Sequence, residues 1–209
     1  MQYHSLPMQT LRRLPVYLKY LQSLAGVQNI SSVGIADALG FNTVQVRKDL
    51  ALVSSGGRPR TGYVVRDLTA DIESYLGYDD ITSAVLVGAG ELGRALLSSK
   101  GFAQYGLDIV AAFDIHPPKA GVHGKQVLPA EKLAGLCRRM NIKIGIITVP
   151  ECAAQAVCDT LVASGVLAVW NFAPVQLKVP ANVLVLNENM ASSLAVLSQH
   201  LALQLREAE

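Results

Sequence analysis

The chain has 209 residues, about half of which (51%) are apolar, and a formal net charge of +2. This length suggests one or two domains, and the apolar content is sufficient for a real hydrophobic core. No apolar run reaches the roughly 18 residues of a membrane span, and the N-terminus lacks the apolar stretch and cleavage site of a signal peptide, so we expect a cytoplasmic protein.

The charge is unevenly distributed along the chain. Residues 1–66 carry eight Lys or Arg residues and two acids, for a local net charge of +6, whereas the remaining residues carry −4. A basic N-terminal part on an acidic body suggests that the basic part binds a polyanion.

The first predicted elements are helices. Leucines at helical spacing predict a helix over residues 11–24 that ends at Gly26. Ser31 or Ser32 can cap a short second helix, which ends at Gly40.

A third helix follows almost at once. Asn42 or Thr43 can cap it, and we expect four apolar residues to face inward, namely Val44, Val46, Leu50 and Val53. Two short helices joined by a tight glycine turn, the second of them basic, have the layout of a helix-turn-helix.

The segment GGRPRTGYVV, residues 56–65, predicts a turn followed by a strand over residues 63–65. This arrangement is typical of the β wing of a winged helix. Arg58 and Arg60 would then lie near the tip of the wing.

Polar and basic side chains of this region are candidate DNA contacts, because the second helix of a helix-turn-helix lies in the major groove. We expect Gln45 or Arg47 to contact base edges, since Gln pairs with adenine and Arg with guanine, and Lys48 to contact bases or phosphates. Arg58 and Arg60 are expected at a minor groove or at the DNA backbone. The alternative for any one of these residues is a solvated charged face. The full candidate set is Ser31, Ser32, Thr43, Gln45, Arg47, Lys48, Arg58 and Arg60.

A polar helix within residues 67–80 is expected to connect two domains, with Asp67 or Thr69 near its start. From residue 81 onward, strands alternate with helices, and the strands are continuous apolar runs, as expected for strands buried on both faces of a parallel sheet. The predicted strands are Ala84–Val87, Ile109–Phe113, Ile144–Thr148, Leu167–Trp170 and Val183–Leu186. The predicted helices include Leu92–Ser99 and Ala153–Ser164.

The chain closes with an amphipathic helix of roughly four turns. Its apolar stripe consists of Leu194, Leu197, Leu201 and Leu205. The stripe either packs against its own subunit or inserts across a dimer, and the sequence leaves both alternatives open.

A glycine-rich turn follows the first strand of this second region. Gly88, Gly90 and Gly93 form the pattern G-x-G-x-x-G between a strand and a helix, which is the context of a dinucleotide site. Gly88 permits the tight turn, Gly90 lets the backbone approach the pyrophosphate, and Gly93 lets helix and strand pack closely. The free N–H groups of the helix N-terminus favour phosphates.

Asp114 lies 21 residues after Gly93, at the end of the next strand, about where an acid reaches the adenosine ribose. A carboxylate there would repel a 2′-phosphate, so we expect NAD(H) rather than NADP. The alternative is that Asp114 serves only as a turn residue.

Two later strand ends are also expected to border the cofactor, because ligands lie beyond the carboxyl ends of such strands. Residues 148–150 could form a wall, and residues 171–174 could contact the nicotinamide side. Each could also be an ordinary turn. The complete candidate set is Gly88, Ala89, Gly90, Glu91, Leu92, Gly93, Asp114, Thr148, Val149, Pro150, Asn171 and Phe172.

Signs of catalysis are missing from the sequence. None of the four histidines lies at a predicted strand end near the nicotinamide, no Tyr-x-x-x-Lys pair occurs, and the basic helical region takes the place of a substrate domain. The three cysteines lack metal-ligand spacing, so no metal is expected. We therefore favour a sensor over an oxidoreductase.

Taken together, the motifs RRLPVYLKYL, ISSVGIADALG, VQVRKDL, TGY, LVGAGELGRAL, VAAFD, TVP and NFAP resemble, in that order, those of the redox-sensing transcriptional repressors called Rex. The resemblance implies a homodimer that binds palindromic operator DNA, and it implies that NADH binding releases the DNA from the protein. It implies a winged-helix domain over residues 1–80, a Rossmann domain over 81–190, and a dimerisation helix over 191–209 that is exchanged between subunits.

The chain departs from the family pattern at positions that the resemblance links to the switch. Ser99 stands where the family usually has a tyrosine, in a segment that also contains Phe102. Asn189 stands where the family often has an aspartate that pairs with an N-terminal arginine, here Arg12 or Arg13. The alternative expectation is therefore a DNA-binding regulator with an altered NADH response, in which the dinucleotide is mainly structural.

Overall fold

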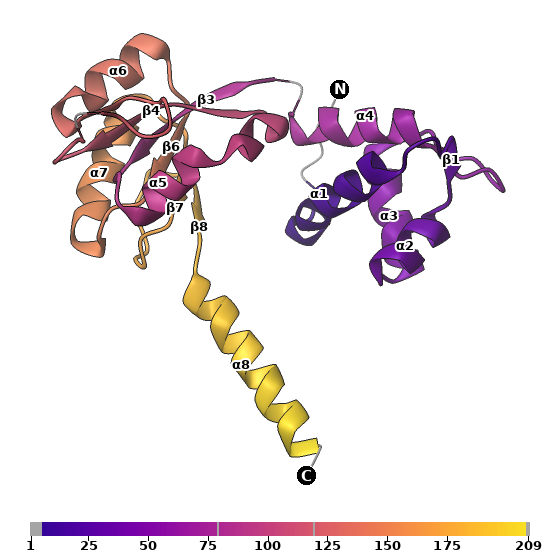
Figure 1. The fold of residues 1–209 in the computed structure, drawn as a ribbon. Coiled ribbons are helices and arrows are strands. Elements are labelled where there is room, and N and C mark those ends of the chain that lie inside the picture. The colour runs from indigo at the N-terminus through magenta and orange to yellow at the C-terminus, as the bar shows by residue number, and fades with distance from the viewer. Residues whose placement is uncertain (1–5, 79, 119, 208–209) are drawn as a thin grey trace. The chain divides into compact units, whose positions relative to one another are not determined.

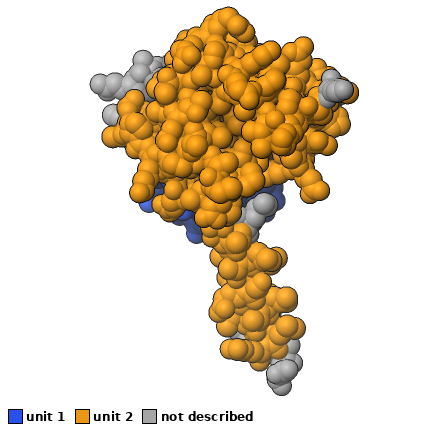
Figure 2. Space-filling view, turned by 90° about the vertical axis from the view of Figure 1, so that its left-hand side faces the viewer, with its two compact units in different colours: residues 1–80 blue, residues 81–209 orange. Residues whose placement is uncertain are grey.

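The computed structural model describes residues 6–78, 80–118 and 120–207 and divides into two compact units, residues 1–80 and residues 81–209 (Figures 1 and 2). Each unit has its own hydrophobic core. Within the described residues, none of the helices combines the length and apolar character needed to cross a membrane.

The first unit is a helical domain with a small two-stranded sheet. Its helices are α1 (Met8–Ser23), α2 (Ser32–Leu39), α3 (Thr43–Val53) and α4 (Val65–Leu76), and its strands are β1 (Asn29–Ile30) and β2 (Tyr63–Val64). The antiparallel pairing of β1 with β2 closes the wing against the start of α2.

Side-chain caps fix the helix-turn-helix. The Ser31 hydroxyl accepts the Gly34 amide at 3.0 Å, and the Asn42 side chain accepts the amides of Val44 and Gln45 at 2.9 and 3.2 Å. Gly40 ends α2 with a left-handed φ of +67°. Of the two cap candidates at each helix start, Ser31 and Asn42 are therefore confirmed.

The predicted strand over residues 63–65 is one residue too long. Only Tyr63 and Val64 pair with β1, because Val65 begins α4 and is buried in the core of the unit. Gly62 has a φ of +76°, and its missing side chain leaves room for the backbone of Ile30.

The core of the first unit confirms three of the four inward positions predicted on α3. Val46 and Leu50 are fully buried, and Val53 packs against them. The prediction for Val44 is wrong, since 57% of its surface is exposed. Val44 is in the first turn of α3, on the side opposite Val46, so that the helix turns it away from the core.

A buried carboxylate joins α1 to α3. Asp49 is only 3% exposed, and it accepts hydrogen bonds from Thr10 Oγ1 (2.9 Å), Tyr17 Oη (2.8 Å), and Nε and Nη2 of Arg13 (2.7 and 2.8 Å). Burial by itself raises the pKa of Asp49, but the hydrogen bonds from Arg13, Tyr17 and Thr10 outweigh it and leave the pKa below its usual value. Burial, together with the hydrogen bond to Asp49, raises the pKa of Tyr17 to about 12.

The second unit contains a six-stranded parallel sheet with the strand order β5-β4-β3-β6-β7-β8. The strands are β3 (Thr82–Val87), β4 (Leu107–Asp114), β5 (Val127–Pro129), β6 (Ile144–Ile147), β7 (Ala168–Asn171) and β8 (Leu184–Asn187). Numbered along the chain, this is the order 3-2-1-4-5-6 of a dinucleotide-binding fold, in which the order reverses between β3 and β6.

Helices cover both faces of this sheet (Figure 1). On one face α5 (Glu91–Ser98) and the 3₁₀ helix η1 (Lys100–Tyr105) contribute Leu97 and Phe102 to the core. On the other face α6 (Leu133–Met140) and α7 (Glu151–Ala163) contribute Cys137, Cys158 and Leu161. Burial raises the pKa of both buried thiols, which keeps them protonated and weakly reactive.

All five predicted strands occur, but the short β5 and the 3₁₀ helix η2 (Ala130–Lys132) were not expected. The helix α6 is one of the helices expected between strands, although the sequence analysis gave no bounds for it. The expectation that every strand is buried on both faces is wrong for β8. Leu184 and Leu186 of this edge strand are 74% and 49% exposed.

The closing helix α8 (Met190–Glu207) follows β8 and extends from the body of its unit (Figure 2). Every side chain described from residue 191 to residue 206 is exposed. The four leucines of the predicted apolar stripe are between 53% and 65% exposed. In this structure the stripe does not pack against the rest of its own chain, the first of the two alternatives, and insertion across a dimer stays a prediction.

We expect Asp49→Asn to destabilise the protein by about 3 kcal/mol at neutral pH, because it leaves the part-buried Arg13 cation without a counter-charge. The pKa of Asp49 is lowered in the folded state, so its contribution is complete above the unfolded pKa, near 4, and is lost as the pH falls through the folded value. In urea unfolding, the gap between variant and wild type should therefore close in acid. Asp37→Asn, at an exposed carboxylate on α2, is the control; an equal loss from both changes would refute the assignment.

Candidate dinucleotide and nucleic-acid sites

The loop after β3 meets the loop after β6 at the point where the strand order reverses. Gly88 has a φ of +105°, and a Cβ there would come within 2.7 Å of the Thr148 carbonyl. A Cβ on Gly93 would collide with the Gly88 carbonyl oxygen, whereas a Cβ on Gly90 would meet nothing within 4 Å. The tight turn at Gly88 and the close packing at Gly93 agree with the roles expected from the sequence, whereas the approach of Gly90 to a pyrophosphate stays a prediction.

The start of α5 carries free backbone donors. Gly90 is the N-cap residue of α5 and supplies no side-chain cap, so the first amides, from Glu91 to Gly93, lack a capping partner. The Glu91 carboxylate is exposed at this helix end. The loop thus offers an anion N–H groups and the positive end of a helix dipole.

Arg94 is a residue of this site that the sequence analysis missed. Its Nε donates to the Ala89 carbonyl at 2.9 Å, which holds the guanidinium beside the glycine loop. The only signal for it in the sequence is a basic residue directly after the third glycine.

Asp114 lies at the end of β4 beside the same loop. Its Oδ2 accepts the Ala89 amide at 2.7 Å and its Oδ1 accepts the His116 amide at 2.8 Å. These two bonds fix the carboxylate, and an ionised carboxylate has about four acceptor sites, so two remain for ribose hydroxyls.

Thr148 connects the loop after β6 to the loop after β3 through hydrogen bonds. Its hydroxyl lies 2.7 Å from the Gly88 carbonyl oxygen and 3.1 Å from that of Val87. Val149 is half-buried, and Pro150 is exposed and precedes α7. The hydroxyl of Thr148 is thus used inside the protein, which makes it a residue that positions the glycine loop.

The side chains of Asn171 and Phe172, both predicted to border the cofactor, differ in their surroundings. Asn171 is fully buried, and its Nδ2 donates to the carbonyls of Ala173 and Val175 and to Asn187 Oδ1. This side chain therefore shapes the loop after β7. Phe172 is half-buried, and its ring centroid lies 4.8 Å from that of Trp170.

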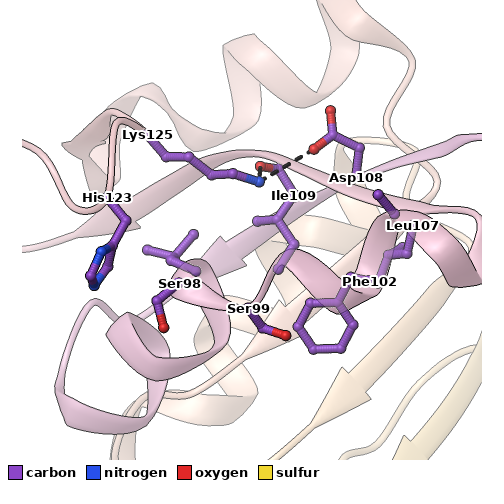
Figure 3. A pocket seen from close by; sticks show the side chains of 10 residues that line it. Ser98, Ser99, Phe102, Leu107, Asp108, Ile109, His123 and Lys125 are labelled. Atoms are coloured by element: carbon purple, nitrogen blue, oxygen red, sulfur yellow. Dashed lines mark hydrogen bonds and ion pairs between the residues drawn. The ribbon is translucent and has the colours of Figure 1, made fainter.

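Ser99 and Phe102 line a cavity of about 430 Å³ at the end of α5 (Figure 3). Opposite them, Lys125 reaches across to Asp108 (3.3 Å) and to the Ile109 carbonyl (2.6 Å). Asp108 and Ile109 belong to the first half of β4, whereas Asp114 ends it. The glycine loop precedes α5 and Ser99 follows it, so the length of α5, about 12 Å, separates the two.

A cavity of about 400 Å³ lies between α2, α3 and the wing in the first unit. We call it the wing cavity; it is lined by Ser31, Ser32, Val33, Arg47, Gly57, Arg58, Pro59, Arg60, Gly62 and Tyr63. It brings together five of the eight predicted DNA-binding residues. The other three, Thr43, Gln45 and Lys48, lie elsewhere on α3.

Charge gathers at the wing cavity. Burial raises the pKa of Tyr63, and the charge of Arg47 partly opposes this. Arg60, near the wing tip, has a left-handed φ of +70°, unusual for a residue other than glycine. Arg47, Arg58 and Arg60 line the cavity and give it a cationic rim.

Gln45 is held by a residue of α1. With its amide oxygen turned toward the guanidinium, Gln45 Oε1 accepts from Arg13 Nη1 at 2.8 Å and from Nη2 at 3.3 Å. This leaves the amide N–H₂ of Gln45 available to DNA. A bidentate pair with adenine, as expected from the sequence, needs the oxygen as well and would have to break this contact.

The residues assigned to the switch are engaged locally. Arg13 is bound to Asp49 within its own unit, and Asn189 Oδ1 accepts the Ser192 amide at 3.0 Å at the start of α8. Arg12 is exposed on α1. Of the two candidate arginines, Arg12 is the one whose side chain is not already committed to Asp49.

Among the residues that the structure describes, no group of three or more His, Cys, Asp or Glu side chains is placed to hold a metal ion.

Comparison with known proteins bears on both units. A family model described as CoA binding domain matches residues 79–175, and one described as putative DNA-binding protein N-terminus matches residues 5–51. The redox-sensing transcriptional repressor Rex of Porphyromonas gingivalis is 43% identical over 195 residues, which cover 91% of this chain and 89% of the relative. The Rex of Clostridium acetobutylicum is 37% identical over 198 residues, covering 93% and 92%.

Solved structures agree with these sequence relatives. The crystal structure of RSP, a Rex-family repressor, in complex with beta-NAD+ and operator DNA matches with a TM-score of 0.91 at 32% identity, covering 98% of this chain and 96% of that one. RSP in complex with beta-NADH matches with a TM-score of 0.86 at 31% identity, covering 99% and 100%. The chain belongs to the Rex family of redox-sensing transcriptional repressors.

Proposed function

We propose that this protein is a cytoplasmic, homodimeric repressor that binds palindromic operator DNA and uses NAD(H) as its effector, with NADH releasing the DNA. The observation that carries the proposal is the match of nearly the whole chain to a repressor solved with both operator DNA and a nicotinamide dinucleotide. The proposed domains are the winged helix (residues 1–80), the Rossmann domain (81–190) and the dimerisation helix (191–209).

The wing cavity supports the assignment of DNA to the first unit. Arg47, Arg58 and Arg60 form its cationic rim, and Lys48 follows Arg47 on the exposed side of α3. Arginine and lysine provide affinity for phosphates without sequence preference, while residues near the start of the recognition helix contact base edges. In this proposal Ser31 and Asn42 act indirectly, by fixing the two helix starts.

The glycine loop supports the assignment of the dinucleotide to the second unit. The pyrophosphate would lie over Gly90 and receive the amides of residues 91–93, with Arg94 beside it. Asp114 would accept the adenosine ribose hydroxyls, which favours NAD(H) over a 2′-phosphorylated cofactor. Val149, Pro150 and Phe172 would border the nicotinamide end.

The proposed preference for NADH follows from the chemistry of the nicotinamide ring. The oxidised ring is a cation, and burying a cation in apolar surroundings costs free energy that the neutral reduced ring does not require. Half-buried Phe172 and Val149 supply such surroundings. Release of DNA then requires that NADH bind the non-operator state of the dimer better than the operator state.

A homodimer is supported by the exposed leucines of α8 and β8. Six large apolar side chains of α8 are at least 45% exposed, among them Leu194, Leu197 and Leu201. Contiguous apolar surface of this kind marks an interface. Exchange of α8 between two subunits would cover it and would set the spacing of the two DNA-binding units.

A second candidate is a repressor whose DNA binding responds weakly or differently to NADH. Two observations favour it: Asn189 caps α8 rather than carrying a charge, and Arg13 is already bound to Asp49. The resemblance adds a third point, since Ser99 stands where it leads us to expect a tyrosine. We propose no enzymatic activity for this chain, in keeping with its repressor relatives.

The proposed function is tested by fluorescence anisotropy with a palindromic operator from the protein's own promoter region. At fixed salt, NADH should release the DNA while NAD⁺ should leave it bound. If DNA binds but neither nucleotide changes the binding, the second candidate holds and Ser99→Tyr and Asn189→Asp should restore the response. If the operator does not bind, the proposal is refuted.

We expect Gly90→Val to abolish NAD(H) binding while the fold and operator binding persist. Its backbone angles suit any residue and a Cβ there meets nothing within 4 Å, so the new side chain occupies only the space assigned to the pyrophosphate. Titration calorimetry with NADH measures the loss. Gly135→Val on α6, at a glycine with equally open surroundings, is the matched control and should bind NADH normally.

We expect Arg58→Ala to weaken operator binding and to reduce the slope of log K against log salt by about one, as for the loss of one phosphate contact. Arg139→Ala, at an exposed arginine of α6, should leave both quantities unchanged. An unchanged slope for Arg58→Ala would remove the wing from the proposed DNA contacts.

A further inference from the structure

The first turn of α3 exposes an apolar side chain. Val44 is 57% exposed, whereas its neighbours on the core side, Val46 and Leu50, are fully buried. Val44 lies in the first turn of α3, the helix that the proposed function places in the major groove, whereas the similarly exposed Leu52 lies near its other end. In the proposed complex, Val44 is therefore the exposed apolar side chain of α3 that is placed to contact the DNA bases.

The surroundings of Val44 indicate what kind of partner this is. Its backbone amide is already bound to Asn42 Oδ1 at 2.9 Å, so the side chain is the group left to make contact. Arg47 and Lys48 follow three and four residues later, which places their side chains beside it on the helix surface. Arg47 also lines the wing cavity. An apolar group flanked by two cations fits a surface that is anionic at its edges and carries an apolar group between them.

We propose that Val44 contacts the methyl group of a thymine in the major groove and so determines sequence preference at that base pair. The C5-methyl of thymine is the apolar group that unmodified DNA presents in this groove. The inference rests on the proposed operator binding and adds a specificity-determining residue to it.

Geometry and entropy favour this role for a valine. The N-terminal residues of the recognition helix are those that contact base edges, and Val44 is the second residue of α3. A β-branched side chain has one strongly preferred rotamer in a helix, so little side-chain freedom is lost on contact. The contact would discriminate thymine from cytosine, which has no methyl group at this position.

The test removes the methyl group without changing any hydrogen bond. Each thymine of the operator is replaced in turn by deoxyuridine, symmetrically in both half-sites, and binding is measured by fluorescence anisotropy for the wild type and for Val44→Ala. At one thymine position, the substitution should weaken wild-type binding by roughly three- to tenfold for each half-site.

The variant makes the assignment specific. Val44→Ala should lose a similar amount on the unmodified operator and should be insensitive to deoxyuridine at that same position. Leu52→Ala is the matched control, since Leu52 is 52% exposed two turns further along α3. It should bind the operator like the wild type and keep the sensitivity to deoxyuridine. Thermal unfolding monitors the fold of both variants, and neither exposed position should shift it appreciably.

The outcomes separate this inference from the proposed function. Wild-type binding that is indifferent to every thymine methyl, or a Val44→Ala variant that keeps the full deoxyuridine effect, overturns the role of Val44 and leaves operator binding intact. Wild-type protein that fails to bind the operator at all overturns both.

Discussion

Two backbone segments touch at the centre of the parallel sheet, and glycine is what permits the contact. Gly88 lies against the Thr148 backbone, Gly93 lies against Gly88, and the Thr148 hydroxyl bonds to the same turn. Because these contacts fix the loop before any ligand arrives, the amides at the start of α5 are already oriented toward one point. In the proposed complex, the site would therefore require little rearrangement to receive a phosphate at these amides.

In the first unit, the buried Asp49 carboxylate fixes two helices relative to each other. Asp49 draws Thr10, Arg13 and Tyr17 of α1 onto α3, in a position that is almost completely buried. One turn earlier, Gln45 Oε1, turned toward the same guanidinium, accepts from Arg13 Nη1 at 2.8 Å. The helix α3 is thus held by polar contacts on one flank as well as by its apolar core, which restrains its orientation in the first unit.

Local sequence patterns predicted most of the fold and the glycine loop. The caps of α2 and α3, the glycine turns and the apolar strands all depend on short stretches of sequence, which is why they could be predicted. What the sequence did not predict has two causes. Some contacts join residues that are far apart in the chain, and nothing in the spacing of Arg13 and Asp49 indicates that they meet across 36 residues. The inward position predicted for Val44 was wrong for a different reason, because apolar character alone does not distinguish a core residue from an exposed one. The exposure of β8 depends on its place at the sheet edge, which sequence does not show.

Trp170 is the only tryptophan of the chain. Its indole donates to Glu188 Oε1 at 3.0 Å, and its ring centroid lies 5.9 Å from that of Phe102 and 4.8 Å from that of Phe172. The emission of this single fluorophore therefore reports on one small region, between the loop that ends β7 and the segment after α5. Trp170 is near the carboxyl end of β7, the end of the sheet at which the dinucleotide is proposed to bind. Its fluorescence could therefore follow dinucleotide binding without an added label.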